Sequence, residues 1–184
     1  MPNRYLLPGL LLAATACRHD QPAEPTIYFG PNGGYSPRNY ANLPTGRQDP
    51  TDWTSDATWS DSERQLFAGL NLSLDGPQVP AETWWPSGYP NPAARASGAR
   101  FALAVLAPTA ALPTTATSVS LVVVDARYQV LDRFTLPTTQ QQQLDLMLQP
   151  DSRYSVPATY RVYYVVHDAT RVYYRGHGDI QLDL

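Results

Sequence analysis

Residues 117–125 read Thr-Ser-Val-Ser-Leu-Val-Val-Val-Asp, and this stretch decides the fold class. Every second residue from 119 to 123 is apolar, so these side chains would share one face of an extended chain. The opposite face carries Val122 and Val124. A strand that is apolar on both faces is expected to lie in the centre of a sheet, buried on both sides.

Further alternating segments surround this strand in the sequence. They cover residues 100–107, 128–136, 143–149, 159–166, 171–175 and 179–184. Polar turns such as Asp168-Ala169-Thr170 separate them, while Gly176 and Gly178 predict a bulge or bend. Several strands of about five to eight residues with polar turns are typical of an antiparallel β-sandwich of the immunoglobulin type.

One helix is expected ahead of these strands, over about residues 60–70. Ser60 and Glu63 form a capping box, in which each side chain binds a backbone N–H that the helix leaves unpaired. The apolar residues at helical spacing are Leu66, Phe67 and Leu70. After the helix, the alternation over residues 71–75 predicts one short strand.

The N-terminus has the layout of an export signal. Arg4 precedes the apolar residues 6–16, a stretch shorter than the roughly 18–20 residues that a membrane-spanning helix needs. Cys17 follows directly and is the only cysteine, so no internal disulfide can form. The alternatives are a lipid-modified cysteine and an ordinary cleaved signal with an incidental thiol.

The segment Leu12-Ala-Ala-Thr-Ala-Cys17 resembles the lipobox of bacterial lipoproteins, with Ala14 where that family usually has Leu. The resemblance implies cleavage before Cys17 and acylation, for example by palmitate, of the new N-terminal cysteine. Two or three acyl chains, at about 0.8 kcal/mol for each buried methylene, hold a protein stably on a membrane. We therefore expect a lipid-anchored envelope protein, on the outer membrane of a Gram-negative bacterium.

The predicted organisation has four parts. Residues 1–16 are the signal peptide, and residues 17–25 are the lipidated cysteine and a flexible, proline-containing tether. Residues 26–88 form a loop-rich N-terminal extension with the short helix, and residues 89–184 form the sandwich. The fold class is mainly β: an antiparallel immunoglobulin-like β-sandwich with one short helix in an N-terminal extension.

A second resemblance concerns residues 89–136. Tyr89-Pro-Asn-Pro-Ala93, read together with residues 100–103 and 119–125, resembles two groups of bacterial envelope modules. These are the C-terminal sorting domains of the type IX secretion route and the related FlgD-like immunoglobulin modules. The resemblance implies the fold and the envelope location. It does not extend to the sorting role, because the basic C-terminal end of sorting signals is absent.

The candidate ligand-binding residues are Trp84, Trp85 and Tyr89, in the segment Trp-Trp-Pro-Ser-Gly-Tyr. Adjacent aromatic rings in a proline- and glycine-rich loop would form a platform for sugar rings or for a partner's side chains. The alternative is structural: Trp84 or Trp85 closes one end of the sandwich, and Tyr89 fixes the following turn. Exposure of the tryptophan pair discriminates between them.

The sequence offers no catalytic motif. Gly-x-Ser-x-Gly is absent, and the formal net charge of −3 gives no basic surplus for binding nucleic acid. His167 and His177 with Asp168 and Asp179 would suit a metal site, but polar residues beside a turn are the favoured interpretation. We expect no metal, no cofactor and no enzyme activity.

These observations predict a lipid-anchored cell-envelope protein with a non-catalytic binding or structural role. Its expected partners are the membrane, reached through the lipid, and an envelope protein or glycan. The first alternative is a surface carbohydrate-binding module that uses the aromatic platform. A hydrolase with unidentified carboxylates is the weaker alternative.

Overall fold

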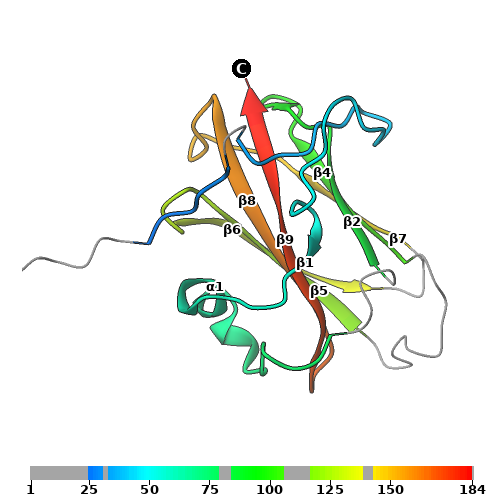
Figure 1. Cartoon of the computed structure of the whole chain (residues 1–184), viewed down its shortest axis with the longest axis vertical. Helices are drawn as coiled ribbons and strands as arrows, with labels where there is room; N and C mark the ends of the chain where they lie inside the picture. Colours follow the sequence, from blue (N-terminus) through cyan, green and yellow to red (C-terminus); the bar gives the residue numbers. More distant parts are fainter. Residues whose placement is uncertain (1–24, 31–32, 79–83, 106–116, 139–142, 184) are drawn as a thin grey trace, which may run out of the picture.

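The computed structural model of the chain describes residues 25–30, 33–78, 84–105, 117–138 and 143–183. The protein is mainly β, with antiparallel sheets and one short α-helix, as the sequence predicts. The two sheets face each other across an apolar core (Figure 1). Cys17 and the predicted signal and tether up to residue 24 lie outside the described residues. Among the described residues, no helix is long and apolar enough to span a bilayer.

The smaller sheet has three strands in the order β2-β4-β7. They are β2 (Trp84–Tyr89), β4 (Ala99–Val105) and β7 (Gln143–Leu148). The larger sheet has the order β1-β9-β8-β5-β6, and β3 (Ala93–Ala94) is added in parallel to β9. Its other strands are β1 (Thr54–Ser55), β5 (Thr117–Val124), β6 (Val130–Thr138), β8 (Ala158–His167) and β9 (Val172–Asp183).

β5 is buried on both faces, which confirms the prediction from residues 117–125. It lies between β6 and β8. Val119, Leu121 and Val123 belong to the core between the sheets. Val122 and Val124 belong to a second cluster on the outer face of the larger sheet. The alternation in the sequence therefore encodes two different cores.

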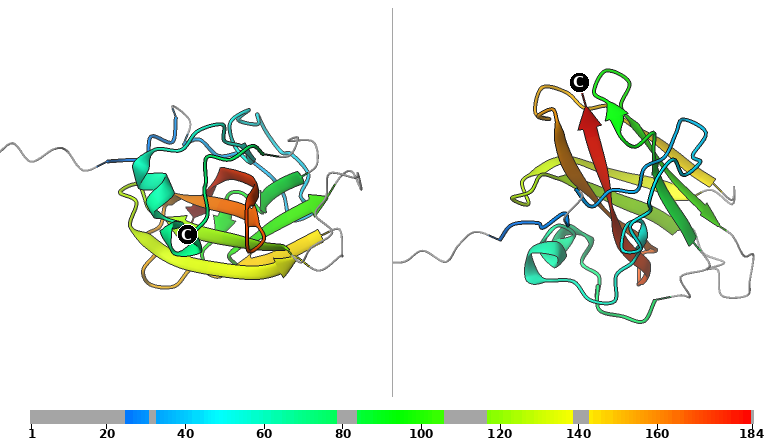
Figure 2. Two further views of the ribbon diagram at one scale, coloured as in Figure 1. Left: turned by 90° about the horizontal axis from the view of Figure 1, so that it is seen from below. Right: turned by 45° about the horizontal axis from the view of Figure 1, so that its top comes forward.

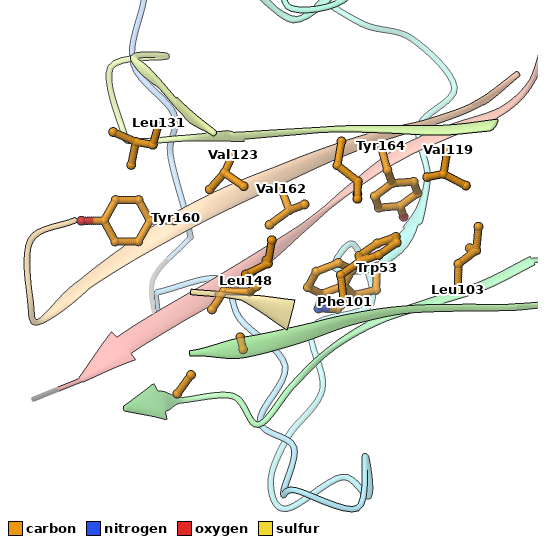
Figure 3. Packing of buried hydrophobic residues seen from close by; sticks show 14 of the residues in the cluster. Trp53, Phe101, Leu103, Val119, Val123, Leu131, Leu148, Tyr160, Val162 and Tyr164 are labelled. Atoms are coloured by element: carbon orange, nitrogen blue, oxygen red, sulfur yellow. The ribbon is translucent and has the colours of Figure 1, made fainter. Parts of the chain in front are cut away.

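The core between the sheets is built around Trp53 (Figure 3). Its indole stacks on Tyr164 at a centroid distance of 6.3 Å and lies 6.0 Å from Phe101. Trp53 has a φ of 59°, which bulky residues rarely adopt. Its backbone N–H donates to the carbonyl of His177, which fixes the residue on β9. The N-terminal extension thus supplies the centre of the sandwich core.

The predicted helix is present but shorter than expected. α1 covers Asp61–Gln65, with the complete Ser60–Glu63 capping box, and a 3-10 turn covers Ala68–Leu70. The α-helix stops because Phe67 leaves the helical region, with φ −116° and ψ 15°. Leu66 and Phe67 pack into the second cluster, over the outer face of the larger sheet. In both views of Figure 2, α1 lies beside the start of the described chain.

Three sequence-based expectations are wrong. Residues 71–75 form a bend and a turn instead of a strand, although Leu72 and Leu74 both pack toward the second cluster as their alternation suggests. Residues 84–89 are strand β2 rather than part of a loop-rich extension, so the first strand of the smaller sheet begins at Trp84 and not at residue 89. β9 continues without a register shift through Gly176 and Gly178, where a bulge or bend was expected.

Candidate functional site

The predicted aromatic platform is divided between the two faces of β2. Trp84 is buried in the core, at 6% exposure, whereas Trp85 is 45% exposed. Consecutive residues of a strand point to opposite faces, so the two indoles cannot share a plane. The sequence predicted a loop here because Pro86 and Gly88 are typical loop residues, and the prediction therefore missed the separation of the two indoles. Pro86 is tolerated because β2 is an edge strand.

Trp85 and Tyr89 share the outer face of the smaller sheet by strand alternation, although Tyr89 is only partly exposed. Of the three predicted binding residues, Trp85 therefore has the most accessible ring. Its neighbour across the strand pair is Ala104 on β4. A small side chain in this position leaves the indole uncovered on that side.

A compact loop, residues 38–44, lies against this face. Arg38 and Pro44 pair as an isolated antiparallel bridge, and the N–H of Asn39 donates to the carbonyl of Leu43 at 3.0 Å. Oδ1 of Asn39 accepts hydrogen bonds from the N–H groups of Ala41 and Leu43. These bonds within the loop help to fix its conformation.

Two side chains join the loop to β2. The guanidinium of Arg38 lies over the Trp85 ring, 5.8 Å from its centroid, in a cation–π arrangement. Nη1 of Arg38 donates to the backbone carbonyl of Asn42 at 3.0 Å, and Nδ2 of Asn42 donates to Oγ of Ser87 at 3.0 Å. The loop and the strand therefore form one surface.

The Pro-Asn-Pro segment, residues 90–92, is hydrogen-bonded to the same loop. Asn91 is fully buried and exchanges two backbone hydrogen bonds with Arg38 at 2.8 Å each. Its side chain donates to the carbonyl of Asp179 and accepts from the N–H of Gln181, both on β9. The motif therefore links the loop to the larger sheet.

We name this region the Trp85 surface and define it by the residues of the loop and strand that meet there. They are Arg38, Tyr40, Asn42, Leu43 and Trp85. Tyr40 is 73% exposed and Leu43 is 59% exposed. Three of the four large exposed apolar side chains among the described residues thus lie in this one region. Sequence reasoning found Trp85 alone, because the loop lies more than 40 positions away from it in the sequence.

The histidines considered for a metal site lie apart, each with its own partners. His177 is opposite Tyr163 across β8 and β9, whereas His167 is opposite Val172. Nδ1 of His177 lies 2.8 Å from a carboxylate oxygen of Asp56. Nε2 of His167 lies 2.9 Å from Oγ of Ser120. In the part of the chain that the structure describes, no three metal-ligating side chains come together.

The two predicted aspartates of that site also have structural partners. Asp168 closes its turn by accepting hydrogen bonds from Thr170 and from the hydroxyl of Tyr173, and these bonds hold the pKa of Asp168 well below its usual range. Asp179 is buried and accepts two hydrogen bonds of 2.7 Å from the guanidinium of Arg161. Both carboxylates therefore already have hydrogen-bond partners within the fold.

A buried carboxylate that the sequence did not single out lies next to Asp179. Oδ2 of Asp52 accepts from the N–H of Ser36, and Oδ1 accepts from the N–H of Asp179, each at 2.7 Å. No cation pairs with Asp52 within 4.0 Å among the described residues. Burial raises the pKa of Asp52 to about 7, and the two backbone N–H donors only partly oppose this rise. Asp52 thus links Ser36 of the N-terminal extension to Asp179 of β9 by hydrogen bonds, while its carboxyl group has no cation as a partner among the described residues.

No protein-family model matches the chain. The chain also matches none of the curated proteins with which it was compared.

Proposed function

We propose that the protein is a lipid-anchored cell-envelope protein with a non-catalytic binding or structural role. The observation that carries this proposal is Cys17, the only cysteine, directly after an apolar segment of export-signal length. The proposal assigns no catalytic residue. It places the domain on the outer membrane of a Gram-negative bacterium.

The position of Ile27 limits the length that a tether from Cys17 would have. Among the described residues, Ile27 is the first whose side chain packs into a core, and its N–H donates to the carbonyl of Ala126 at 2.7 Å. Nine residues lie between Cys17 and Ile27, and an extended chain over these ten Cα–Cα steps reaches at most about 35 Å. The domain would therefore stay close to the membrane surface.

The strand order supports the immunoglobulin-like part of the proposal. The order β2-β4-β7 in one sheet corresponds to strands A, B and E of that fold. The order β6-β5-β8-β9 in the other corresponds to C′, C, F and G. These strands also follow one another in the chain as the immunoglobulin topology requires.

The test of the lipid anchor is metabolic labelling with a radioactive fatty acid. We expect the label to enter the full-length protein and to be lost in Cys17→Ala. Mass spectrometry of the native protein should give an N-terminus at acylated Cys17. An unprocessed N-terminus, or equal labelling of Cys17→Ala, contradicts the proposal.

A second candidate function is glycan binding at the cell surface, and the exposed indole of Trp85 beside Arg38 favours it. A glycan array with the wild type and Trp85→Ala tests it. Tyr28→Ala is the matched control, because Tyr28 is 79% exposed and adjoins Ile27, away from β2. Binding that survives in Trp85→Ala, or no binding at all, removes this candidate.

A further inference from the structure

We propose that the Trp85 surface binds an acidic polysaccharide, with the ring of a uronate sugar on Trp85 and its carboxylate on Arg38. This inference rests on the glycan-binding candidate above and names its class of ligand. It is carried by the distribution of charge, the state of Arg38 and the shape of the surface around Trp85.

The two sequence segments that supply the Trp85 surface carry a charge opposite in sign to that of the whole chain. The chain has a formal net charge of −3, yet residues 33–48 and 84–105 contain no Asp or Glu. The arginines of these two segments are Arg38, Arg47, Arg95 and Arg100. A positive region on a negative protein favours an anionic ligand.

Arg38 belongs to the arginines that donate to backbone carbonyls rather than to aspartates, as Arg95, Arg133 and Arg175 also do, but Arg38 lies beside an exposed indole. Arg64, Arg153 and Arg161 each form an ion pair with an aspartate. Within the described part of the chain, no carboxylate lies within 4.0 Å of Arg38, and its Nη1 donates to the carbonyl of Asn42 instead. Asp52 interacts with Arg38 electrostatically without ion-pair contact. An arginine held in place by a backbone carbonyl, with no carboxylate bound to it directly, can receive a carboxylate from a ligand.

The surface next to Arg38 fits a ring rather than a point charge such as phosphate. The Trp85 indole is 45% exposed, and the small residue Ala104 lies opposite it on β4. The C–H face of a sugar would stack on the part of the indole that Arg38 leaves exposed, and the guanidinium over the rest of the ring would then meet a carboxylate on the same sugar. Asn42 and Tyr40 add hydrogen-bonding groups at the edge of the site.

The test uses the purified full-length protein in detergent, with polygalacturonate and alginate as acidic probes. Highly methyl-esterified polygalacturonate is the matched neutral probe, because it keeps the sugar backbone and removes the charge. We expect binding to the acidic probes, at least tenfold weaker binding to the methyl ester, and weakening by added NaCl.

The variants separate the site from general attraction of charge. Trp85→Ala and Arg38→Gln should each weaken binding at least tenfold. Arg127→Gln, an exposed arginine in the turn between β5 and β6, and Tyr28→Ala should leave it unchanged. Because Arg38 also supports the loop, Arg38→Lys is included: it keeps the charge but loses the planar fork, and it should bind more weakly than the wild type.

Each other outcome overturns the inference in a distinguishable way. Equal, Trp85-dependent binding of the acidic and esterified probes keeps the glycan candidate and rejects the acidic ligand. Acidic binding that Arg127→Gln reduces as much as Arg38→Gln indicates attraction of charge without a site. Absence of glycan binding rejects both, and Trp85-dependent cross-linking to an envelope protein without glycan binding assigns the surface to a protein partner.

Discussion

The indole of Trp53 lies directly on the backbone of Gly178: a Cβ atom at position 178 would come within 2.1 Å of Cδ2 of the ring. A Cβ at Gly88 would come within 2.3 Å of Cζ2 of the same ring. The ring therefore packs against two glycines, one on β9 and one on β2, and links the two sheets. No other residue type fits at either position without displacement of the indole.

Gly178→Ala should destabilise the protein by at least about 2–3 kcal/mol, because the added methyl group must displace a packed indole or the backbone of β9. Urea denaturation followed by tryptophan fluorescence measures this. Gly69→Ala is the control, since a Cβ at Gly69 meets nothing within 4 Å. Equal denaturation midpoints for the two variants would show that Trp53 does not occupy this space.

Trp84→Ala and Trp85→Ala should differ strongly in stability although the residues are adjacent. Trp84 is buried, and its truncation should cost about 3–5 kcal/mol. Trp85 is half-exposed and its ring lies under the guanidinium of Arg38, so its truncation should cost less than about 1 kcal/mol. Chemical denaturation of both variants checks the order, and the reverse order would contradict the assignment of the two faces.

Trp84→Phe refines this comparison. Nε1 of Trp84 has no hydrogen-bond partner among the described residues. Replacement by phenylalanine removes this unsatisfied donor while it retains most of the apolar ring. Trp84→Phe should therefore lose clearly less stability than Trp84→Ala in the same denaturation experiment.

Asp52 should make the protein less stable as the pH rises from about 4 to about 7. The pKa of Asp52 is raised from 3.8 to about 7 in the folded protein, so the unfolded chain ionises at a lower pH than the folded one. The stabilisation of the protonated carboxyl is complete below about pH 4 and is lost as the pH passes about 7, by up to about 4 kcal/mol.

Asp52→Asn tests this pH dependence. Near pH 4 the folded wild type carries a protonated carboxyl, whose hydroxyl oxygen can still accept an N–H, whereas the amide NH2 of Asn directs donors at one of the two N–H groups. The variant should therefore be less stable than the wild type near pH 4. The difference should shrink toward pH 8, because the variant has no group at position 52 to ionise. Asp49→Asn, at a carboxylate whose pKa Thr51 lowers, should leave the slope between pH 4 and 7 unchanged. Parallel pH profiles of wild type and Asp52→Asn contradict the prediction.

Arg161 and Asp179 should depend on each other for stability. Arg161→Leu leaves Asp179, which is 2% exposed, without its cation and should cost about 3–5 kcal/mol. The double variant Arg161→Leu/Asp179→Leu should lose less than the sum of the two single variants, since it leaves no unpaired charge. A double-mutant cycle from urea denaturation measures the coupling, and additive losses would contradict the pairing.

The features that the sequence predicted well are those encoded within a few consecutive residues. The alternation over residues 117–124 determined that β5 is central and faces two cores. Ser60 and Glu63 determined where the helix begins, because both halves of the capping box lie within one turn. Strand alternation and helix capping depend on local backbone geometry, which is why residue order alone reveals them.

Tertiary structure decided the features that depend on distant partners. Gly178 resembles a bulge-forming glycine until Trp53, more than 120 positions away, is placed on it. In the sequence, Trp84 and Trp85 suggest two aromatic residues in one loop. In the structure, residues 84–89 pair with β4 as a strand, so one ring faces the core and the other faces outward. The contact of Arg38 with Trp85 and the burial of the Asp52 carboxyl also depend on residues distant in the sequence, so no local pattern predicts them. The sequence by itself determined the strands and the helix start. The positions of side chains that meet across the sandwich were decided only by packing, because contact and burial depend on residues that no local pattern connects.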